Sequence, residues 1–569
     1  MTTTTTVPKP GNELADELLR VLLDADPLRA VLLGLPAPAG LPDPTERAER
    51  ALAERLRGVV ARADGIDRAA LDPADRLTLD VLRAIAVGEA GVADARKPEW
   101  QVTDLWDSPV AGMLIFLPMS TLPGPGEADG YVGRLRALDG YLAGVADRHR
   151  AGVVAGRVPV ERLVRASVAQ VDGYLAAPER DPFTRPEPPA AWDRAARFRA
   201  EVERALVEVV RPAFRRYRDV LEAEIAPHAR PDDRPGLSWL PGGDEAYQVL
   251  VRTSTTTTRT PEELHETGLG LVARLAEEYA QLGGRVFGVS DPAEVMRRLR
   301  EDPALRCTSA EQMLEEARRA IERAEEAAPR WFGRLPAQRC AVRVVPEEDA
   351  PRAPGAYYMP AALDGTRPGT YFQNTRDPAG LGRHVLQPTA FHEAVPGHHF
   401  QVALAQEMDV PMLRRIFEFD AFDEGWALYC ERLADEMGLY TDDVARLGML
   451  AGDSMRAVRL VVDTGLHALG WSRGRALDYM VANTPLARTD LEVEVDRYIA
   501  APAQALSYMV GRLEIQRLRA EAERRLGAAF DVRAFHDTVL GAGSVPMVTL
   551  AARVDDWLAA PSDPGDRAG

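Results

Sequence analysis

A helical spacing of apolar residues runs through most of the 569-residue chain and constrains its fold more than any other feature. Leucine and valine side chains recur at steps of three and four residues with charged residues between them, as at Leu18, Leu22, Leu52, Leu56 and Val59. This period indicates helices that bury one face against one another. The sequence therefore predicts a mainly α-helical protein.

One segment departs from this pattern. Residues 340–345 alternate as in a strand, and residues 356–360 and 369–374 form two more short runs typical of strands. We expect a disordered tail over 1–12, a helical N-terminal lobe that covers a cleft over 13–335, and a catalytic lobe over 336–560. A second disordered tail is expected over 561–569. Within the first lobe, Thr260 followed by Pro261 predicts a capped helix start.

Composition excludes several classes of protein. The net charge of −18 argues against a nucleic-acid partner, because phosphate binding needs an excess of Lys and Arg. Three widely spaced cysteines form neither a disulfide framework nor a cysteine metal knuckle. The threonine-rich N-terminus lacks the features of a signal peptide, and the longest apolar run is too short to cross a bilayer. We predict a cytoplasmic monomer or homodimer that binds neither membrane nor nucleic acid.

Three of the nine histidines fall within eight residues, beginning at His392. The zinc motif HExxH places its two histidines one helical turn apart, but here Pro396 occupies the position of the second one. On a straight helix His392 and His398 would stand about 9 Å apart along the axis. Pro396 removes a helical hydrogen bond and Gly397 frees the backbone, so a two-residue excursion there would bring His398 to His392. His399 needs a three-residue excursion and ranks second.

A carboxylate from a later helix is expected as the third ligand. Glu424 is the first candidate, while Asp423 and Glu431 compete with it or orient a ligand histidine from behind. Two histidines and one glutamate leave a fourth position open, which is the arrangement of catalytic zinc. The sequence thus predicts one Zn²⁺ per chain, with Glu393 as the general base that takes a proton from water.

Hydrolysis also needs a hydrogen-bond donor for the oxyanion. Tyr508 is the first candidate, followed by His467 and Tyr498. The predicted strands next to the histidines could hold an extended peptide at a sheet edge or could be purely structural. Side chains assigned to substrate binding lie near this segment or near the oxyanion candidates: His399, Tyr498, Arg367 and Tyr371.

A charged stripe at helical spacing is formed by Arg456, Arg459 and Asp463 within an apolar stretch. It predicts either a buried ionic network or a clamp for a substrate carboxylate. The network is the favoured interpretation.

Four segments together resemble a known family. They are HEAVPGHHFQ from His392, DEGWALYCE from Asp423, RAVRLVVDTGLHALGW from Arg456 and EVDRYIAAPAQALSYMVG from Glu494. In this order they are similar to the bacterial family numbered 885 among the domains of unknown function. PAALDGTRPGTYFQNT from Pro360 and GAGSVPM from Gly541 also fit, and the resemblance is strong over residues 247–557.

That family looks like a branch of the helical gluzincin metallopeptidases, which include the Taq-type carboxypeptidases, thimet oligopeptidase and angiotensin-converting enzyme. The resemblance implies a two-lobed helical shell around a deep central cleft, with one small sheet beside the zinc helix. It also implies that His392, His398 and Glu424 bind zinc and that Glu393 is the base. The segment around Tyr508 is similar to the one that holds the transition-state tyrosine of the Taq-type enzymes. The two residues inserted between the histidines depart from the HExxH pattern.

The favoured function is a zinc-dependent hydrolase, a metallopeptidase or amidohydrolase that acts on short peptides or amide-containing small molecules. A non-hydrolytic enzyme is an alternative, because two histidines and a carboxylate also hold Fe(II). A catalytically degenerate scaffold that only binds a peptide is another. Glu393 favours hydrolysis, because an iron oxygenase has no evident need of a base beside its first ligand.

Overall fold

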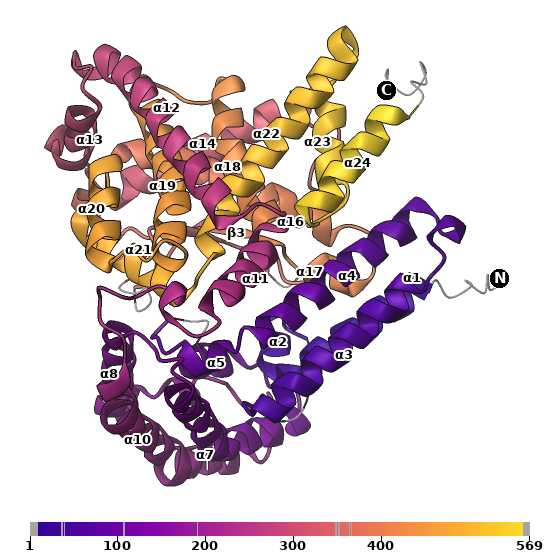
Figure 1. The fold of residues 1–569 in the computed structure, drawn as a ribbon, viewed down its shortest axis with the longest axis vertical. Helices are drawn as coiled ribbons and strands as arrows, with labels where there is room; N and C mark the ends of the chain where they lie inside the picture. Colours follow the sequence, from indigo (N-terminus) through magenta and orange to yellow (C-terminus); the bar gives the residue numbers. More distant parts are fainter. Residues whose placement is uncertain are drawn as a thin grey trace. The chain divides into compact units, whose positions relative to one another are not determined.

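The computed structural model describes residues 10–35, 38, 40–105, 108–190, 192–347, 350, 353–363, 365 and 367–560. The chain is mainly helical with one three-stranded sheet, which confirms the predicted fold class (Figure 1). It divides into two compact units. The first unit comprises Met1–Thr253, Gly465–Ala476 and Glu492–Pro502, and the second comprises Ser254–Thr464, Leu477–Leu491 and Ala503–Gly569. The expected shell around a central cleft concerns the placement of these units and stays a prediction.

The first unit contains the helices of the N-terminal half. They are α1 (Pro10–Ala25), α2 (Pro27–Leu32), α3 (Glu46–Asp64), α4 (Pro73–Asp94), α5 (Lys97–Trp100), α6 (Pro109–Phe116), α7 (Pro125–Val154), α8 (Glu161–Ala176), α9 (Ala195–Ala205), α10 (Arg211–Val220) and most of α11 (Gly243–Thr255). Helix α1 begins inside the tail predicted over 1–12, because Pro10 fits the first turn of a helix. Residues 1–9 and 561–569 of the two predicted tails lie outside the described residues.

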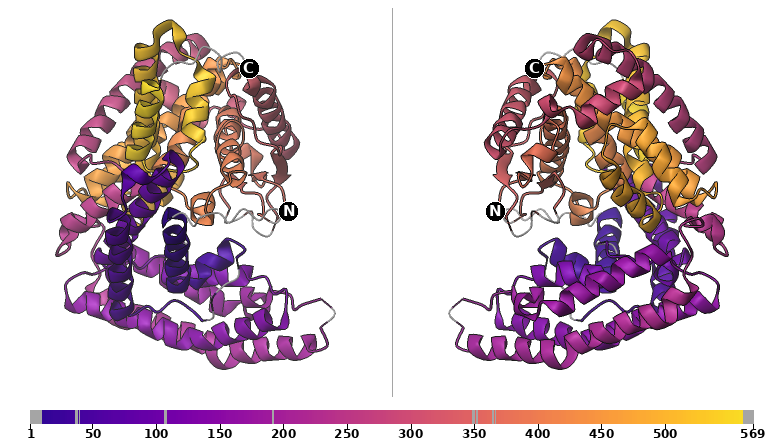
Figure 2. Two further views of the ribbon diagram at one scale, coloured as in Figure 1. Left: turned by 90° about the vertical axis from the view of Figure 1, so that its right-hand side faces the viewer. Right: turned by 90° about the vertical axis from the view of Figure 1, so that its left-hand side faces the viewer.

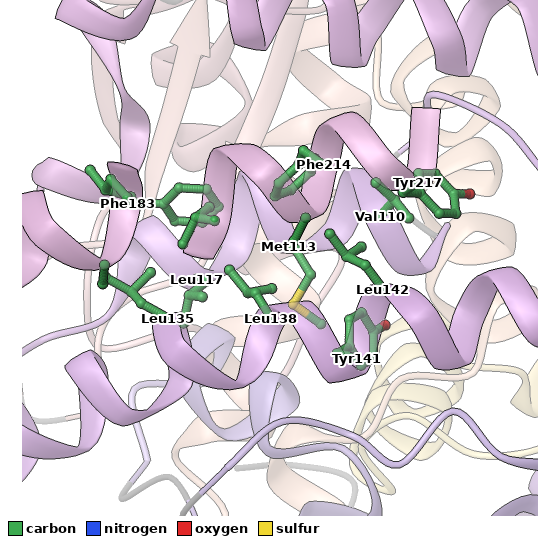
Figure 3. Close-up of a cluster of buried hydrophobic side chains, with 14 of the residues drawn as sticks. Val110, Met113, Leu117, Leu135, Leu138, Tyr141, Leu142, Phe183, Phe214 and Tyr217 are labelled. Atoms are coloured by element: carbon green, nitrogen blue, oxygen red, sulfur yellow. The ribbon is translucent and has the colours of Figure 1, made fainter. Parts of the chain in front are cut away.

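Apolar side chains from α6, α7 and α10 form much of the core of the first unit. Met113, Leu138, Leu142 and Phe214 are buried and point toward one another in Figure 3. The helical segment that begins at Ala195 continues through two π-helical segments, Leu206–Val210 and Leu221–Ile225. The spacing of leucine and valine therefore located these helices but not their local change of pitch.

The second unit contains the remaining helices and the sheet. Its helices are α12 (Pro261–Phe287), α13 (Pro292–Glu301), α14 (Ala310–Ala327), α15 (Leu386–Glu393), α16 (His398–Gln406), α17 (Met412–Ile416), α18 (Asp420–Glu436), most of α19 (Asp443–His467), parts of α20 (Arg473–Asn483) and α21 (Arg488–Ala500), α22 (Ser507–Leu526), α23 (Val532–Leu540) and α24 (Met547–Ala559). Helices α22 and α24, drawn in yellow, lie side by side in Figures 1 and 2. Helix α12 starts as predicted, with Thr260 as N-cap and Pro261 in the first turn, and Glu263 completes a capping box.

The sheet consists of β1 (Ala341–Val344), β2 (Ala356–Met359) and β3 (Thr370–Gln373), which confirms the three predicted strands. The order is β1-β3-β2, with β3 parallel to β1 and antiparallel to β2. Strand β2 is therefore an edge strand. Tyr371 lies opposite Val342 on one side and Tyr358 on the other.

The boundary between the units differs from the one predicted at residue 336. That position marks the beginning of the sheet, whereas helices α12 to α14 already belong to the second unit. The chain also returns to the first unit twice, and boundaries between the units fall inside α11, α19, α20 and α21 and at residue 502. Among the described residues, no helix combines the length and hydrophobicity needed to cross a bilayer.

Candidate metal centre

A break between two helices brings the motif histidines together. Helix α15 ends at Glu393 and α16 begins at His398, which confirms the predicted interruption at Pro396 and Gly397. A side chain at Gly397 would overlap the main-chain carbonyl oxygen of His392, so the loop folds closely over the end of α15. The short loop replaces the single helical turn of HExxH, and the imidazole rings of His392 and His398 lie 5.0 Å apart between centroids.

Helix α18 anchors this loop from behind. The carbonyl oxygen of Pro396 accepts hydrogen bonds from Trp426 Nε1 at 2.9 Å and from Cys430 Sγ at 3.4 Å. Both donors are buried, and they lie one turn apart on the helix that also carries Glu424. We did not predict this contact from the sequence. The four-residue spacing of Trp426 and Cys430 shows that they share a helical face, but not what that face meets.

Among the described residues, one group of three His, Cys, Asp or Glu side chains is spaced to hold a metal ion, and it consists of His392, His398 and Glu424. Their ligand atoms all lie within 4.8 Å of one another. Glu424 Oε2 lies 3.5 Å from His392 Nε2 and 3.4 Å from His398 Nε2. Ligands about 2.0–2.1 Å from a tetrahedral zinc ion stand about 3.3–3.4 Å apart. The spacing therefore fits a zinc ion, and the partly exposed His398 and Glu424 leave one side of the group accessible.

The electrostatics of the group favour a positive charge between its members. Burial lowers the pKa of His392, but hydrogen bonding to Glu424 and Glu431 outweighs burial and raises it to about 9. Burial raises the pKa of Glu424, but its contacts with His392 and His398 hold that pKa well below the ordinary value. A site that favours protonated histidine beside an ionised carboxylate also favours a metal cation in place of the proton.

Glu431 takes the second of its two predicted roles, because it contacts a motif histidine from behind. Its Oε1 lies 2.9 Å from His392 Nδ1, while His392 Nε2 faces Glu424. A carboxylate on Nδ1 fixes the ring orientation and leaves Nε2 as the ligand atom. Tyr440 fixes the same helical turn by donating its hydroxyl to the main-chain oxygen of Glu431.

Asp423 does not orient a histidine, contrary to the prediction. Its carboxylate accepts hydrogen bonds from Gln401 Nε2 at 2.7 Å and from Ser544 Oγ at 2.8 Å. It therefore connects α18 to α16 and to the segment before α24. Asp423 is next to Glu424 in sequence, but its side chain points to a different side of α18, because successive residues of a helix are rotated by about 100°.

The carboxylate of Glu393 is held by the sheet. Its Oε2 accepts a hydrogen bond from the main-chain N–H of Tyr358, on the edge strand β2, at 3.0 Å. Glu393 is also the last residue of α15, one position after His392. This contact holds the carboxylate of the predicted base at the sheet. It also occupies one main-chain donor of the strand proposed to hold a peptide.

His399 lies apart from the metal group. Its Nδ1 is 3.2 Å from Tyr358 Oη and its Nε2 is 3.0 Å from the carbonyl oxygen of Gln338. The ring is buried, and both nitrogens are engaged on the side of the sheet. This placement supports His398 as the ligand, and it contradicts the assignment of His399 to substrate binding.

Two other residues assigned to substrate binding come from the sheet region. Tyr371 is fully buried and donates its hydroxyl to Gln373 Oε1 at 2.6 Å, so it supports the sheet and does not reach substrate. Arg367 is half-buried in the turn before β3, and its Nη1 is buried without a hydrogen-bond partner. Its assignment stays a prediction.

Tyr508 lies in the same unit as the metal group, near the start of α22. The guanidinium carbons of Arg456 and Arg459 lie 5.7 and 4.5 Å from the centroid of its ring. Arg456 Nη2 in turn lies 3.7 Å from Glu431 Oε1. Arg456 of the predicted stripe thus connects Tyr508 to the support of His392, while Arg459 contacts only the tyrosine of these two.

His467 and Tyr498 belong to the first unit, whereas the metal group lies in the second. His467 is fully buried, with Nδ1 accepting from the N–H of Leu237 and Nε2 donating to the carbonyl oxygen of Tyr498. Burial lowers the pKa of His467 to about 3. The hydroxyl of Tyr498 donates to Glu494 at 2.6 Å. Buried side chains engaged in this way do not serve as oxyanion donors or substrate contacts, so these two assignments are wrong.

Comparison with known proteins agrees with the fold and the motifs. Residues 27–554 match the family described as bacterial protein of unknown function (DUF885), and the chain belongs to that family. A structure of a candidate lipoprotein from Colwellia psychrerythraea is 27% identical, with a TM-score of 0.87 over 96% of this chain and 98% of its own. A candidate lipoprotein of unknown function from Shewanella oneidensis is 17% identical, with a TM-score of 0.77 over 96% of this chain and 99% of its own. No curated protein matches the chain.

Proposed function

We propose that this protein is a zinc-dependent hydrolase that cleaves peptide or amide bonds of short substrates. The observation that carries the proposal is the spacing of the three side chains. Glu424 Oε2 lies 3.5 Å from His392 Nε2 and 3.4 Å from His398 Nε2. That spacing fits tetrahedral zinc. Zinc bound there would supply a Lewis acid that polarises a carbonyl and makes water more acidic.

The chain's own residues supply the proton transfers. Glu393 takes a proton from the attacking water and passes it to the leaving amine, while the N–H of Tyr358 holds its second carboxylate oxygen in place. Tyr508 is proposed to donate a hydrogen bond to the oxyanion, with its ring held by Arg456 and Arg459. A cytoplasmic location and a short-peptide substrate remain parts of the proposal.

Metal content tests the ligand set. Purified wild-type chain should contain about one zinc ion, as a three-residue site with an open position requires. His398→Ala and Glu424→Ala should lose it. His399→Ala is the matched control, because its ring nitrogens bind Tyr358 and Gln338 instead. Zinc retained in His398→Ala, or no zinc in wild type after zinc is added, would contradict the proposed centre.

Glu393→Gln separates metal binding from hydrolysis. The amide keeps the size of the side chain but cannot accept the proton, so cleavage of a short-peptide library should fall about 10²- to 10⁴-fold. Zinc content, measured by plasma mass spectrometry, should stay at the wild-type level. Undiminished cleavage in this variant would exclude Glu393 as the base. Zinc without any cleavage by wild type would leave the metal centre but remove the hydrolase.

A further inference from the structure

Glu431 is a buried carboxylate that is only partly compensated by the histidine it supports. Its residue is 1% exposed, and one oxygen faces His392 Nδ1 at 2.9 Å. The other oxygen is buried and has no hydrogen-bond partner. An ionised carboxylate removed from water in this way needs a positive charge close by.

Arg456 supplies that charge from α19. Its Nη2 lies 3.7 Å from Glu431 Oε1, and among the described residues no other Lys or Arg lies within ion-pair distance of Glu431. A β-carbon at Gly452 would stand 2.5 Å from Glu431 Oε2 and 3.2 Å from Arg456 Nη1. The absence of a side chain at Gly452 therefore lets both charged groups lie against the same turn of α19.

The same guanidinium reaches Tyr508. Its carbon lies 5.7 Å from the ring centroid, which is within the range of a cation–π contact. Arg456 is thus placed between the carboxylate behind His392 and the tyrosine proposed to bind the oxyanion. This favours the network interpretation of Arg456 over the clamp for a substrate carboxylate, because its charge is already directed at Glu431.

We infer that Arg456 is a positioning residue of the metal centre, which holds the Glu431 carboxylate in place against His392 Nδ1. The inference rests on the proposed metal centre and not on hydrolysis. With Glu431 accepting a hydrogen bond from Nδ1–H, the neutral ring presents the Nε2 lone pair toward Glu424. Without Arg456 the buried carboxylate loses the guanidinium at ion-pair distance from it, and the hydrogen bond that orients the ring weakens.

Zinc affinity of the full chain, measured by competition with a chromophoric chelator, tests this inference without any substrate. Arg456→Met should weaken zinc binding about 10- to 100-fold, the range found when a partner behind a ligand histidine is lost. Arg456→Lys keeps a positive charge and should recover most of the affinity. The visible spectrum of the Co²⁺-loaded protein should change in Arg456→Met, since the geometry of the ligand ring is altered.

Arg459→Met is the matched control. It removes a guanidinium from the same helix and from the same tyrosine ring, but Arg459 does not contact Glu431. Its zinc affinity and its Co²⁺ spectrum should remain those of wild type. Equal losses in Arg456→Met and Arg459→Met would mean that the arginines act only through general packing, which overturns the inference.

A double-mutant cycle and a second perturbation complete the test. Glu431→Gln should weaken zinc binding, and adding Arg456→Met should cause little further loss, because both changes remove the same interaction. Gly452→Ala displaces Glu431 without removing any charge, and it replaces Arg456→Met if that variant does not fold. Unchanged affinity in Arg456→Met and Gly452→Ala overturns the inference while wild-type zinc binding still stands. A wild-type chain that binds no zinc overturns the metal centre as well.

Discussion

Between the proposed ligand histidines, Gly397 lies where the loop has no room for a side chain. A β-carbon there would overlap the carbonyl oxygen of His392, and the loop is also fixed to α18 through Pro396. Gly397→Ala should therefore move His398 away from Glu424. We expect a loss of about 1–3 kcal/mol in the free energy of unfolding, as for other overpacked positions, together with weaker zinc binding.

Chelator competition and urea unfolding measure the two effects of Gly397→Ala. Gly270→Ala is the control, because it makes the same change inside α12, where the nearest atom to the new carbon is Arg274 Nη1 at 3.6 Å. That variant should keep its zinc and gain about 0.5–1 kcal/mol through higher helix propensity. Full zinc affinity in Gly397→Ala would show that the loop does not set the position of His398.

Residues close in sequence could be assigned roles before the structure was known. The grouping of His392 with His398 followed from the conformational effects of Pro396 and Gly397, which act on their immediate neighbours. The roles given to His467 and Asp423 were wrong, because they depended on which distant side chain each one meets. Buried polar groups find partners through tertiary packing, and a single sequence does not state those partners.

At the scale of the elements, α18 and α22 approach closely where two glycines meet. A β-carbon at Gly425 would stand 2.5 Å from Gly511 Cα, and one at Gly511 would overlap the carbonyl oxygen of Ala421. This crossing fixes α18, which carries Glu424, against the helix that carries Tyr508. The two proposed functional helices are thereby held at a distance that only glycine permits.

Gly511→Ala should separate these helices. The expected cost is about 1–3 kcal/mol in the free energy of unfolding, since backbone atoms cannot move as a flexible side chain would. The rate of hydrolysis should fall by a larger factor than the zinc affinity. Tyr508 moves with α22 relative to the proposed metal ligands, which lie on other helices. Urea unfolding, zinc competition and peptide cleavage measure the three quantities. A stability equal to that of Gly270→Ala would contradict the close approach.

The elements themselves were more predictable than their pairing. Strand periodicity located β1, β2 and β3, and capping chemistry located the start of α12 at Thr260, because both signals are local. The order β1-β3-β2 was not predicted, since it depends on register and chain crossing. The contact between Glu393 and the N–H of Tyr358 follows from that order, and it was missed for the same reason.

At the scale of the whole molecule, the chain forms two units that are discontinuous in sequence. The change of composition near residue 336 predicted a boundary there, but it marks only the beginning of the sheet. The boundaries inside α19, α20 and α21 leave no trace of linker composition, because the helices continue through them. A division of this kind is defined by which helices pack together, and local periodicity does not contain that information.

Each unit encloses a histidine that stays neutral in the folded protein, and this predicts how acid destabilises the molecule. In the first unit, burial lowers the pKa of His149 to about 4, and its ring lies between the carbonyl oxygen of Pro98 and Tyr217 Oη. In the second unit, burial lowers the pKa of His536 to about 3, and its ring bonds Trp331 O and Tyr429 Oη.

Because the folded pKa values lie below the ordinary 6.5, the unfolded chain takes up protons first as the pH falls. The stability that depends on neutral rings is complete above about pH 6.5 and is lost progressively toward pH 3–4, by up to about 1.4 kcal/mol per pH unit for each histidine. The stability advantage of wild type over His149→Gln or His536→Gln should therefore shrink by about 1.5 kcal/mol between pH 6.5 and 5. Urea unfolding at the two pH values measures it, and His228→Gln, at an exposed position, serves as control. The same unfolding curves report on the coupling of the two units. If both buried variants shift one common unfolding transition, the units unfold together. Separate transitions would show that the helices crossing the boundaries do not couple the units. A difference that stays constant with pH in both variants would mean that these rings are not kept neutral by the fold.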